Sequence, residues 1–97
     1  MTTYKPKVLV IDDEKALRTG VKRLLEMENY EVMEAENGTE GIKLGTETEF
    51  DLALIDLKMP DIDGIEVLKQ IKKKFPHTVY SSASYSNFML NILPNGD

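Results

Sequence analysis

The stretches VLVIDD, residues 8–13, and LALID, residues 52–56, share one pattern: four consecutive apolar residues followed directly by aspartate. Such a short apolar run is typical of a strand that is buried on both faces of a parallel sheet. We therefore predict strands at residues 8–11 and 52–55. Asp12, Asp13 and Asp56 then follow the carboxyl ends of these strands.

The segments around these strands change to the spacing of helices, in which residues three and four apart share one face. One apolar stripe lies between Glu14 and Asn29 and consists of Leu17, Val21, Leu24 and Leu25. Another stripe precedes Pro76 and consists of Ile65, Leu68, Ile71 and Phe75. We expect a helix at each stripe. Residues 30–35 and 78–82 are predicted as further strands, and residues 39–44 as a short helix that two glycines weaken.

The resulting order βαβαβαβ predicts one α/β domain over residues 1–97, built on a mostly parallel sheet. A doubly wound, flavodoxin-like sheet places the first and third strands side by side, in the order 2-1-3-4. The helices leave these two strands on opposite faces and open a crevice at the carboxyl ends. We therefore expect Asp12, Asp13 and Asp56 to converge in that crevice.

Three converging carboxylates repel one another unless a cation or a proton lies between them. Hard oxygen ligands without histidine or cysteine favour Mg²⁺, or Mn²⁺, over Zn²⁺. Protein-bound magnesium is usually shared between carboxylates and a phosphate, so the pattern indicates phosphoryl chemistry, in which a carboxylate can itself be the nucleophile. The alternative is that Asp13 only caps the helix that follows it, since aspartate is a preferred N-cap.

The composition is that of a soluble domain, because 41% of the 97 residues are hydrophobic and 30% are charged. The absence of cysteine excludes disulfides and thiolate chemistry. Twelve Lys and Arg residues against seventeen Asp and Glu residues give a net charge of −5, which argues against direct binding of nucleic acid. The N-terminus lacks the apolar run of a signal peptide and no stretch has membrane-spanning length, so we expect a cytoplasmic protein without membrane contact.

Three motifs together resemble the receiver domain of two-component response regulators, including chemotaxis regulators. These motifs are VLVIDDE at 8–14, DLALIDLKMPDIDG at 51–64 and IEVLKQIKKKFP at 65–76. The resemblance covers about residues 5–76 of the chain. It implies a signalling module that is no conventional enzyme but catalyses its own phosphorylation and dephosphorylation.

The resemblance also assigns roles to individual residues. Asp56 would accept a phosphoryl group from a sensor histidine kinase or a phosphotransfer protein. Asp13 would bind Mg²⁺ directly and Asp12 through water, and the backbone carbonyl of Lys58 would complete the ligand set together with Asp56. The family also places a Thr or Ser before Ala at the end of its fourth strand, which makes Ser82 the candidate switch hydroxyl.

Residues 77–97 depart from the family pattern and form a divergent tail. Ser82 is reached early after Pro76, so Ser81 and Ser84 compete for the switch position. The family continues with a helix, a strand ending in Lys-Pro and a last helix, whereas no lysine follows Lys74 here. We therefore expect a fold without this helix-strand-helix and with impaired switching.

Other functions remain open at this point. A domain without its last strand exposes a sheet edge, so we expect a homodimer or a larger assembly through the C-terminal edge. A phosphorylation-incompetent module that self-associates or docks a kinase is the main alternative. An aspartate-nucleophile phosphatase is a weaker one, because such enzymes carry a second aspartate where this chain has Lys58.

Overall fold

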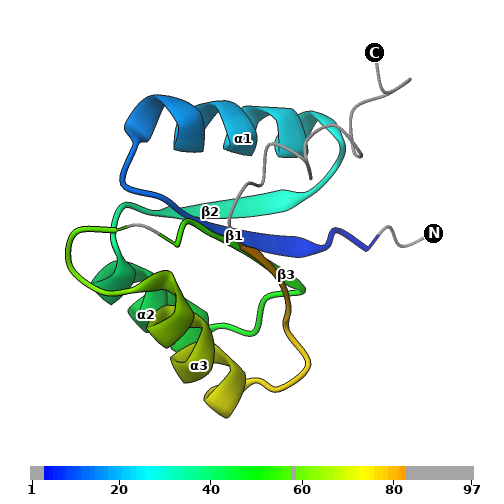
Figure 1. Ribbon diagram of the computed structural model, residues 1–97. Coiled ribbons are helices and arrows are strands. Elements are labelled where there is room, and N and C mark those ends of the chain that lie inside the picture. The colour runs from blue at the N-terminus through cyan, green and yellow to red at the C-terminus, as the bar shows by residue number, and fades with distance from the viewer. Residues whose placement is uncertain (1–3, 58, 83–97) are drawn as a thin grey trace.

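Strands and helices alternate along the chain, as the sequence pattern predicts (Figure 1). The structure is a computed structural model that describes residues 4–57 and 59–82, without the side chain of Ser82. Its elements are β1 (Lys7–Ile11), α1 (Lys15–Met27), β2 (Glu31–Ala35), α2 (Gly38–Glu47), β3 (Leu52–Ile55), α3 (Gly64–Lys74) and β4 (Val79–Ser82). Among the described residues, no helix is long and apolar enough to cross a membrane.

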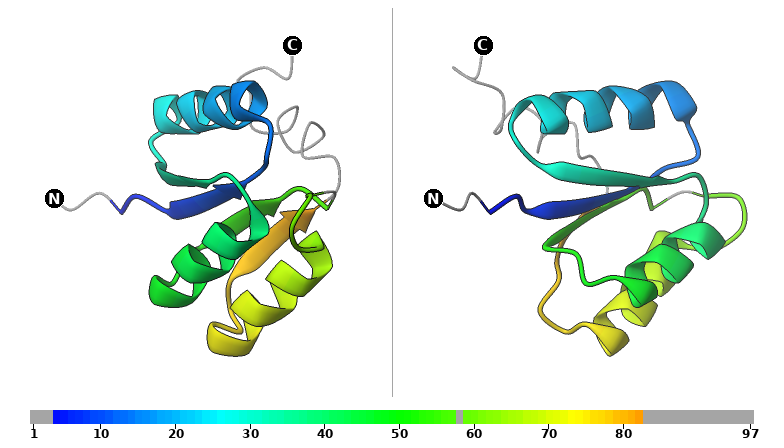
Figure 2. Two further views of the ribbon diagram at one scale, coloured as in Figure 1. Left: turned by 90° about the vertical axis from the view of Figure 1, so that its left-hand side faces the viewer. Right: turned by 180° about the vertical axis from the view of Figure 1, so that it is seen from behind.

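The strands form one parallel sheet in the order β2-β1-β3-β4. In its register Ile11 of β1 lies beside Ala35 of β2 and Ile55 of β3. Helix α1 covers one face of the sheet, and α2 and α3 lie together on the other face (Figure 2). This arrangement confirms the predicted doubly wound α/β fold with strand order 2-1-3-4.

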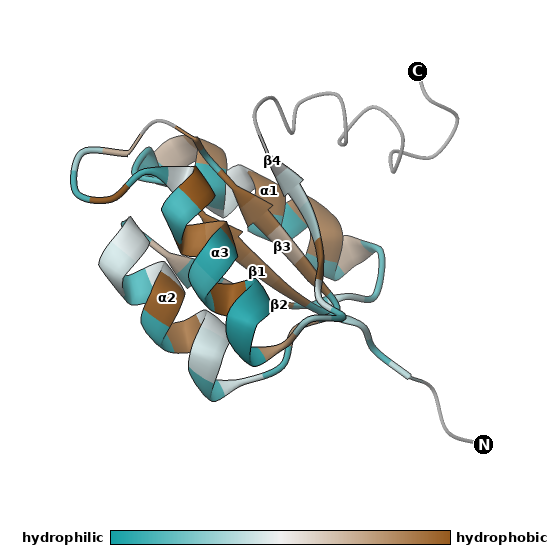
Figure 3. Cartoon of the chain, turned by 60° about the horizontal axis from the view of Figure 1, so that its bottom comes forward, coloured by the Kyte–Doolittle hydropathy of each residue, from teal (hydrophilic) through white to brown (hydrophobic). Residues whose placement is uncertain are grey.

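The strands of the sheet centre supply the core, which explains why their sequences are continuously apolar (Figure 3). Alternate side chains of β1 point to opposite faces. One face packs against α2 and α3 through Leu9, Ile11, Ala35, Phe50, Ala53, Ile55, Val67 and Ile71. The other face packs beneath α1 through Val8, Val10, Val21, Leu25, Val32 and Leu54. Because both faces are covered, neither central strand shows the polar alternation of a half-exposed strand.

The buried faces of two helices differ from the predicted stripes. In α1 the buried side chains are Arg18, Val21 and Leu25, whereas Leu17 is 46% exposed. In α3 Val67 and Ile71 are buried, whereas Ile65 is 43% exposed. Both helices form where the stripes predict them, but Leu17 and Ile65 are not among the buried residues. Successive helix residues are about 100° apart, so Leu17 lies about 40° from the buried Val21 but about 100° from Arg18, at the margin of the buried face. Ile65 lies about 200° from the buried Val67, on the far side of α3.

Helix α2 is longer than the predicted segment 39–44, for a reason that lies in its packing. Gly45 faces the other helix of its layer, and a Cβ atom there would lie 2.5 Å from Ile71 Cδ1. The glycines that weaken the helix in isolation thus permit its close approach to the core. Asn37 caps the helix, since its side chain accepts a hydrogen bond of 2.8 Å from the backbone N–H of Glu40.

Candidate functional site

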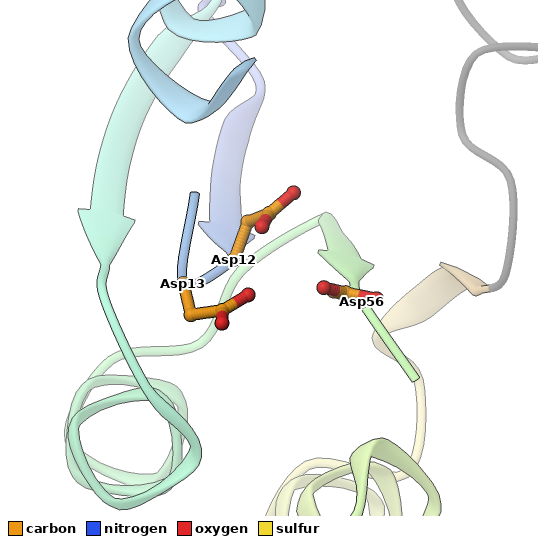
Figure 4. A group of neighbouring side chains, drawn as sticks. All are labelled: Asp12, Asp13 and Asp56. Atoms are coloured by element: carbon orange, nitrogen blue, oxygen red, sulfur yellow. The ribbon is translucent and has the colours of Figure 1, made fainter. Parts of the chain in front are cut away.

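Three aspartates meet at the carboxyl ends of β1 and β3 (Figure 4). Asp12 and Asp13 follow β1, and Asp56 follows β3. Each contributes a carboxylate oxygen, and these oxygens lie within 4.8 Å of one another. Asp12 is buried, Asp56 is half-buried and Asp13 is exposed, so the cluster opens to solvent on one side. The predicted convergence of these residues is confirmed.

The sheet register places these aspartates side by side. The backbone N–H of Asp56 donates to the carbonyl of Ile11 at 2.9 Å, which continues the β1–β3 pairing past the end of β3. On the other side of β1, the N–H of Asp12 donates to the carbonyl of Ala35 at 3.1 Å. Because β1 and β3 are paired in register up to Ile11 and Ile55, the acidic segments that follow them leave the sheet at the same level.

The turn after β1 is closed by Asp12. Its Oδ1 accepts a hydrogen bond of 2.8 Å from the backbone N–H of Glu14. Glu14, without a side-chain capping bond, is the N-cap residue of α1. The alternative interpretation of Asp13 as the helix cap is therefore wrong, and its exposed carboxylate lies beside the other two.

The loop after β3 folds tightly against its own start. The N–H of Gly64 faces the carbonyl of Leu57 at 3.4 Å. A Cβ atom at position 64 would lie 2.6 Å from the carbonyl oxygen of Asp56 and 2.8 Å from Leu57 Cα. Only glycine allows this approach, so Gly64 helps to set the backbone that carries Asp56.

Two further aspartates of this loop hold it to the neighbouring helices. Asp61 accepts hydrogen bonds from the backbone N–H groups of Gly38 at 3.0 Å and Thr39 at 2.9 Å, at the start of α2. The bond from the N–H of Thr39, followed by that from Gly38, holds the pKa of Asp61 well below its usual value. Asp63 caps α3 by accepting a bond of 2.9 Å from the N–H of Ile65. These two carboxylates are structural anchors of the loop.

Arg18 also contacts the site, and its place among the charged and apolar residues of an amphipathic helix gave no sign of this. Its Nη1 donates to the backbone carbonyl of Asp12 at 2.8 Å, and its Nε donates to Glu34 Oε1 at 2.9 Å. A buried arginine is rare unless it is paired, and both partners are present here. The partners lie on β2 and just after β1, so only the folded sheet brings them to α1.

The structure describes only some of the other predicted site residues. Lys58 and Ser84 are outside the described residues. The backbone of Ser82 pairs with Ile55 in the β3–β4 register, at the same end of the sheet as the aspartates. Ser81 precedes it in β4 and is half-buried. The choice of switch hydroxyl and the role of the Lys58 carbonyl stay predictions.

The donor set is chemically suited to a hard divalent cation. It consists of three carboxylates, with no histidine or cysteine among the clustered side chains in the described chain. One buried and one exposed ligand leave room on the solvent side for water or an anionic group, as Mg²⁺ requires. The residues present therefore fit magnesium.

Residues 8–91 match the response regulator receiver domain family, and this match extends past Pro76. The transcriptional regulatory protein ResD of Bacillus subtilis is 51% identical over 72 residues, which cover 74% of this chain and 30% of ResD. The chemotaxis protein CheY of Listeria monocytogenes is 41% identical over 71 residues, which cover 72% of this chain and 60% of CheY. The chain thus spans 30% to 60% of the length of these curated relatives.

Solved structures agree with this assignment. A CheY-like response regulator receiver domain protein from Methanospirillum hungatei superimposes with a TM-score of 0.79 at 32% identity. The superposition covers 92% of this chain and 74% of that protein. The family match covers most of the sequence, and the acidic cluster lies at the sheet edge where the family pattern places it. The chain belongs to the response regulator receiver domain family.

Proposed function

We propose that the chain accepts a phosphoryl group on Asp56, with Mg²⁺ held by Asp12, Asp13, Asp56 and the backbone carbonyl of Lys58. Family membership establishes a two-component signalling domain, and receiver domains bind Mg²⁺ at such an acidic cluster. The observation that carries the proposal is the approach of the three carboxylates to within 4.8 Å at the β1–β3 edge. The proposed donor is the phosphohistidine of a sensor kinase or phosphotransfer protein, and the cytoplasm stays the predicted location.

The proposed reaction is an in-line displacement at phosphorus. A carboxylate oxygen of Asp56 forms a bond to phosphorus while the phosphorus–nitrogen bond to the donor imidazole breaks. The electron pair of the broken bond stays on the imidazole nitrogen, which takes up a proton. When bound, Mg²⁺ neutralises the charge on the transferred phosphoryl oxygens. Attack of water on the acyl phosphate later releases inorganic phosphate and restores the Asp56 carboxylate.

The protein contributes mainly position. Asp56 is half-buried, and the backbone bond to Ile11 holds it at the end of β3, where its carboxylate lies beside those of Asp12 and Asp13. Asp12 and Asp13 hold negative charge beside it, which makes cation binding a condition of bringing in an anionic phosphoryl group. Phosphorylation should therefore depend on the divalent cation.

We propose that the further steps of signalling use a switch hydroxyl, for which Ser82 is the candidate that the resemblance implies. The resemblance also implies a phosphate-binding lysine, and Lys74 is the last lysine among these 97 residues. Impaired switching stays a prediction for these 97 residues on their own.

The proposed function is tested by incubating the chain with Mg²⁺ and a small acyl-phosphate donor and recording its intact mass. We expect one phosphoryl adduct, which is lost when Mg²⁺ is chelated and is absent from Asp56→Asn. Asp51→Asn is the matched control, since Asp51 lies at the opposite end of β3, and it should still form the adduct. An adduct of equal yield in Asp56→Asn would contradict the proposal.

A second candidate function, self-association, is favoured by the exposure of β4. This strand is at one end of the described sheet, and Val79 on it is 62% exposed. An exposed apolar edge strand offers unpaired backbone groups to another chain. We propose that the chain forms a homodimer or larger assembly through this edge, whether or not Asp56 is phosphorylated. Mg²⁺ binding without an adduct would favour this assembly or kinase-docking module over the phosphoacceptor.

Sedimentation at several concentrations tests the proposed assembly. The wild-type mass should rise with concentration, and Val79→Lys should remain monomeric, because a lysine on an edge strand opposes strand pairing. Lys69→Ala, on the exposed side of α3, is the control and should associate like the wild type. A wild-type monomer at every concentration would exclude assembly through β4.

A further inference from the structure

Arg18 holds an unusual place in the molecule, because it is a charged residue on the buried face of α1. Its side chain is 10% exposed and lies against the sheet, where the other buried residues of the helix are Val21 and Leu25. Burial of a guanidinium costs free energy unless hydrogen bonds replace its water. The groups that accept hydrogen bonds from the guanidinium therefore indicate the role of Arg18 in the folded protein.

The guanidinium joins two segments of the fold. Nε donates to Glu34 Oε1 on β2 at 2.9 Å, and Nη1 donates to the backbone carbonyl of Asp12 at 2.8 Å. A guanidinium is planar and its N–H groups diverge at fixed angles. With Nε fixed on Glu34, the direction of the Nη1–H bond toward Asp12 is fixed as well.

The carbonyl that Arg18 binds belongs to the peptide group joining Asp12 to Asp13. A peptide group is planar, so holding its oxygen also fixes the N–H and the Cα of the following residue. Strand β1 ends at Ile11, and just after it the N–H of Asp12 donates to the carbonyl of Ala35 on β2 at 3.1 Å. The bond from Arg18 therefore extends the order of β1 by one peptide group, up to the residue that carries the exposed ligand.

We infer that Arg18 is a positioning residue for the metal site: it orients the Asp12–Asp13 peptide so that the Asp13 carboxylate faces Asp56. This inference rests on the proposed Mg²⁺ site. It concerns neither a ligand nor a group that touches the phosphoryl donor. Groups that orient metal ligands commonly change metal affinity by about 10- to 100-fold when they are replaced.

Arg18 could affect Mg²⁺ binding in two ways, by orienting the Asp12–Asp13 peptide or by the charge of its guanidinium. Its ion pair with Glu34 allows the two effects to be distinguished. An unpaired cation near the cluster would repel Mg²⁺, but Glu34 balances the charge of Arg18 at 2.9 Å. Loss of the arginine charge alone should, by Coulomb's law, tighten Mg²⁺ binding. Loss of the bond to the Asp12 carbonyl should weaken it. The two explanations therefore predict opposite signs.

The double substitution Arg18→Met with Glu34→Met removes the bond to Asp12 and leaves the net charge unchanged. Arg18 is buried and Glu34 is half-buried, and replacing a buried ion pair by apolar side chains of similar size is often neutral for stability. The matched control is Lys22→Met with Glu26→Met, which removes a more exposed ion pair of 3.4 Å on the same helix. Mg²⁺ dissociation constants are measured by titration of backbone amide shifts at constant ionic strength, together with thermal unfolding without metal.

We expect the Arg18/Glu34 variant to bind Mg²⁺ about tenfold more weakly, at the lower end of the range for orienting groups, and the Lys22/Glu26 variant to bind like the wild type. Arg18→Lys keeps the positive charge but lacks the planar guanidinium that can bind Glu34 and the Asp12 carbonyl together, so this variant should also bind Mg²⁺ more weakly. It provides the test if the double variant does not fold. Unchanged or tighter binding in these folded variants would overturn the inference. Absence of Mg²⁺ binding in the wild type would instead contradict the proposed function.

Discussion

Gly64→Ala is expected to destabilise the protein by about 2–3 kcal/mol, as overpacking against a rigid neighbour does. It should also prevent Mg²⁺-dependent phosphorylation. The added methyl group would lie 2.6 Å from the carbonyl oxygen of Asp56 and 2.8 Å from Leu57 Cα. These are backbone atoms, which cannot rotate away as the end of a side chain can. The loop must therefore move, and Asp56 moves with it.

Gly20→Ala is the control for the same chemical change. Gly20 lies in α1, and a Cβ atom there would have no neighbour within 4 Å. Alanine in a helix interior is favoured over glycine by about 0.5–1 kcal/mol, so this variant should be more stable and phosphorylated as well as the wild type. Urea unfolding and intact mass give both readouts. A Gly64→Ala protein with wild-type stability and adduct yield would refute the steric account of the loop.

Asp13→Asn is expected to change stability in opposite directions with and without metal. In metal-free buffer at low salt the variant should be more stable than the wild type by about 1 kcal/mol, because a like charge is removed from a group of oxygens within 4.8 Å. With Mg²⁺ in hundredfold excess over its dissociation constant, the wild type gains about 2.7 kcal/mol. The variant should gain much less, so the order of stability reverses.

Thermal unfolding with a chelator and with saturating Mg²⁺ measures this reversal. Glu31→Gln removes one negative charge at the start of β2, at the opposite end of the sheet, and controls for the net charge of −5. It should respond to Mg²⁺ as the wild type does. Equal Mg²⁺ stabilisation of Asp13→Asn and the wild type would show that Asp13 does not bind the cation.

The sequence predicts the strands well because strands buried on both faces consist of consecutive apolar residues. Residues 52–55 are β3 as predicted, and the parallel order follows from the alternation of strands and helices. The sequence indicates less clearly which face of each helix is buried. Leu17 and Ile65 have the right spacing, but the sheet contacts Arg18 and Val67 instead, and hydropathy alone gives no reason to bury an arginine.

The candidate site likewise contains residues that the sequence predicts and residues that it does not. The three aspartates follow strand ends directly, so strand order alone places them together. Arg18 and Asp61 bind backbone groups on other elements, and no local sequence pattern predicts those partners. Asp61 binds the start of α2, more than twenty residues earlier in the chain, and the bond of Arg18 to Asp12 depends on how α1 lies on the sheet.

The identity of the phosphorylated residue tests the central claim most directly. Borohydride reduces an aspartyl phosphate to homoserine, which survives digestion and can be located by tandem mass spectrometry. Cleavage after Lys43 and Lys58 yields a peptide that contains Asp51 and Asp56, and fragmentation separates the two. We predict homoserine at position 56 alone, and only after incubation with Mg²⁺ and the phosphoryl donor. Homoserine at position 12, 13 or 61, with Asp56 unmodified, would contradict the assignment of Asp56 as the phosphoacceptor.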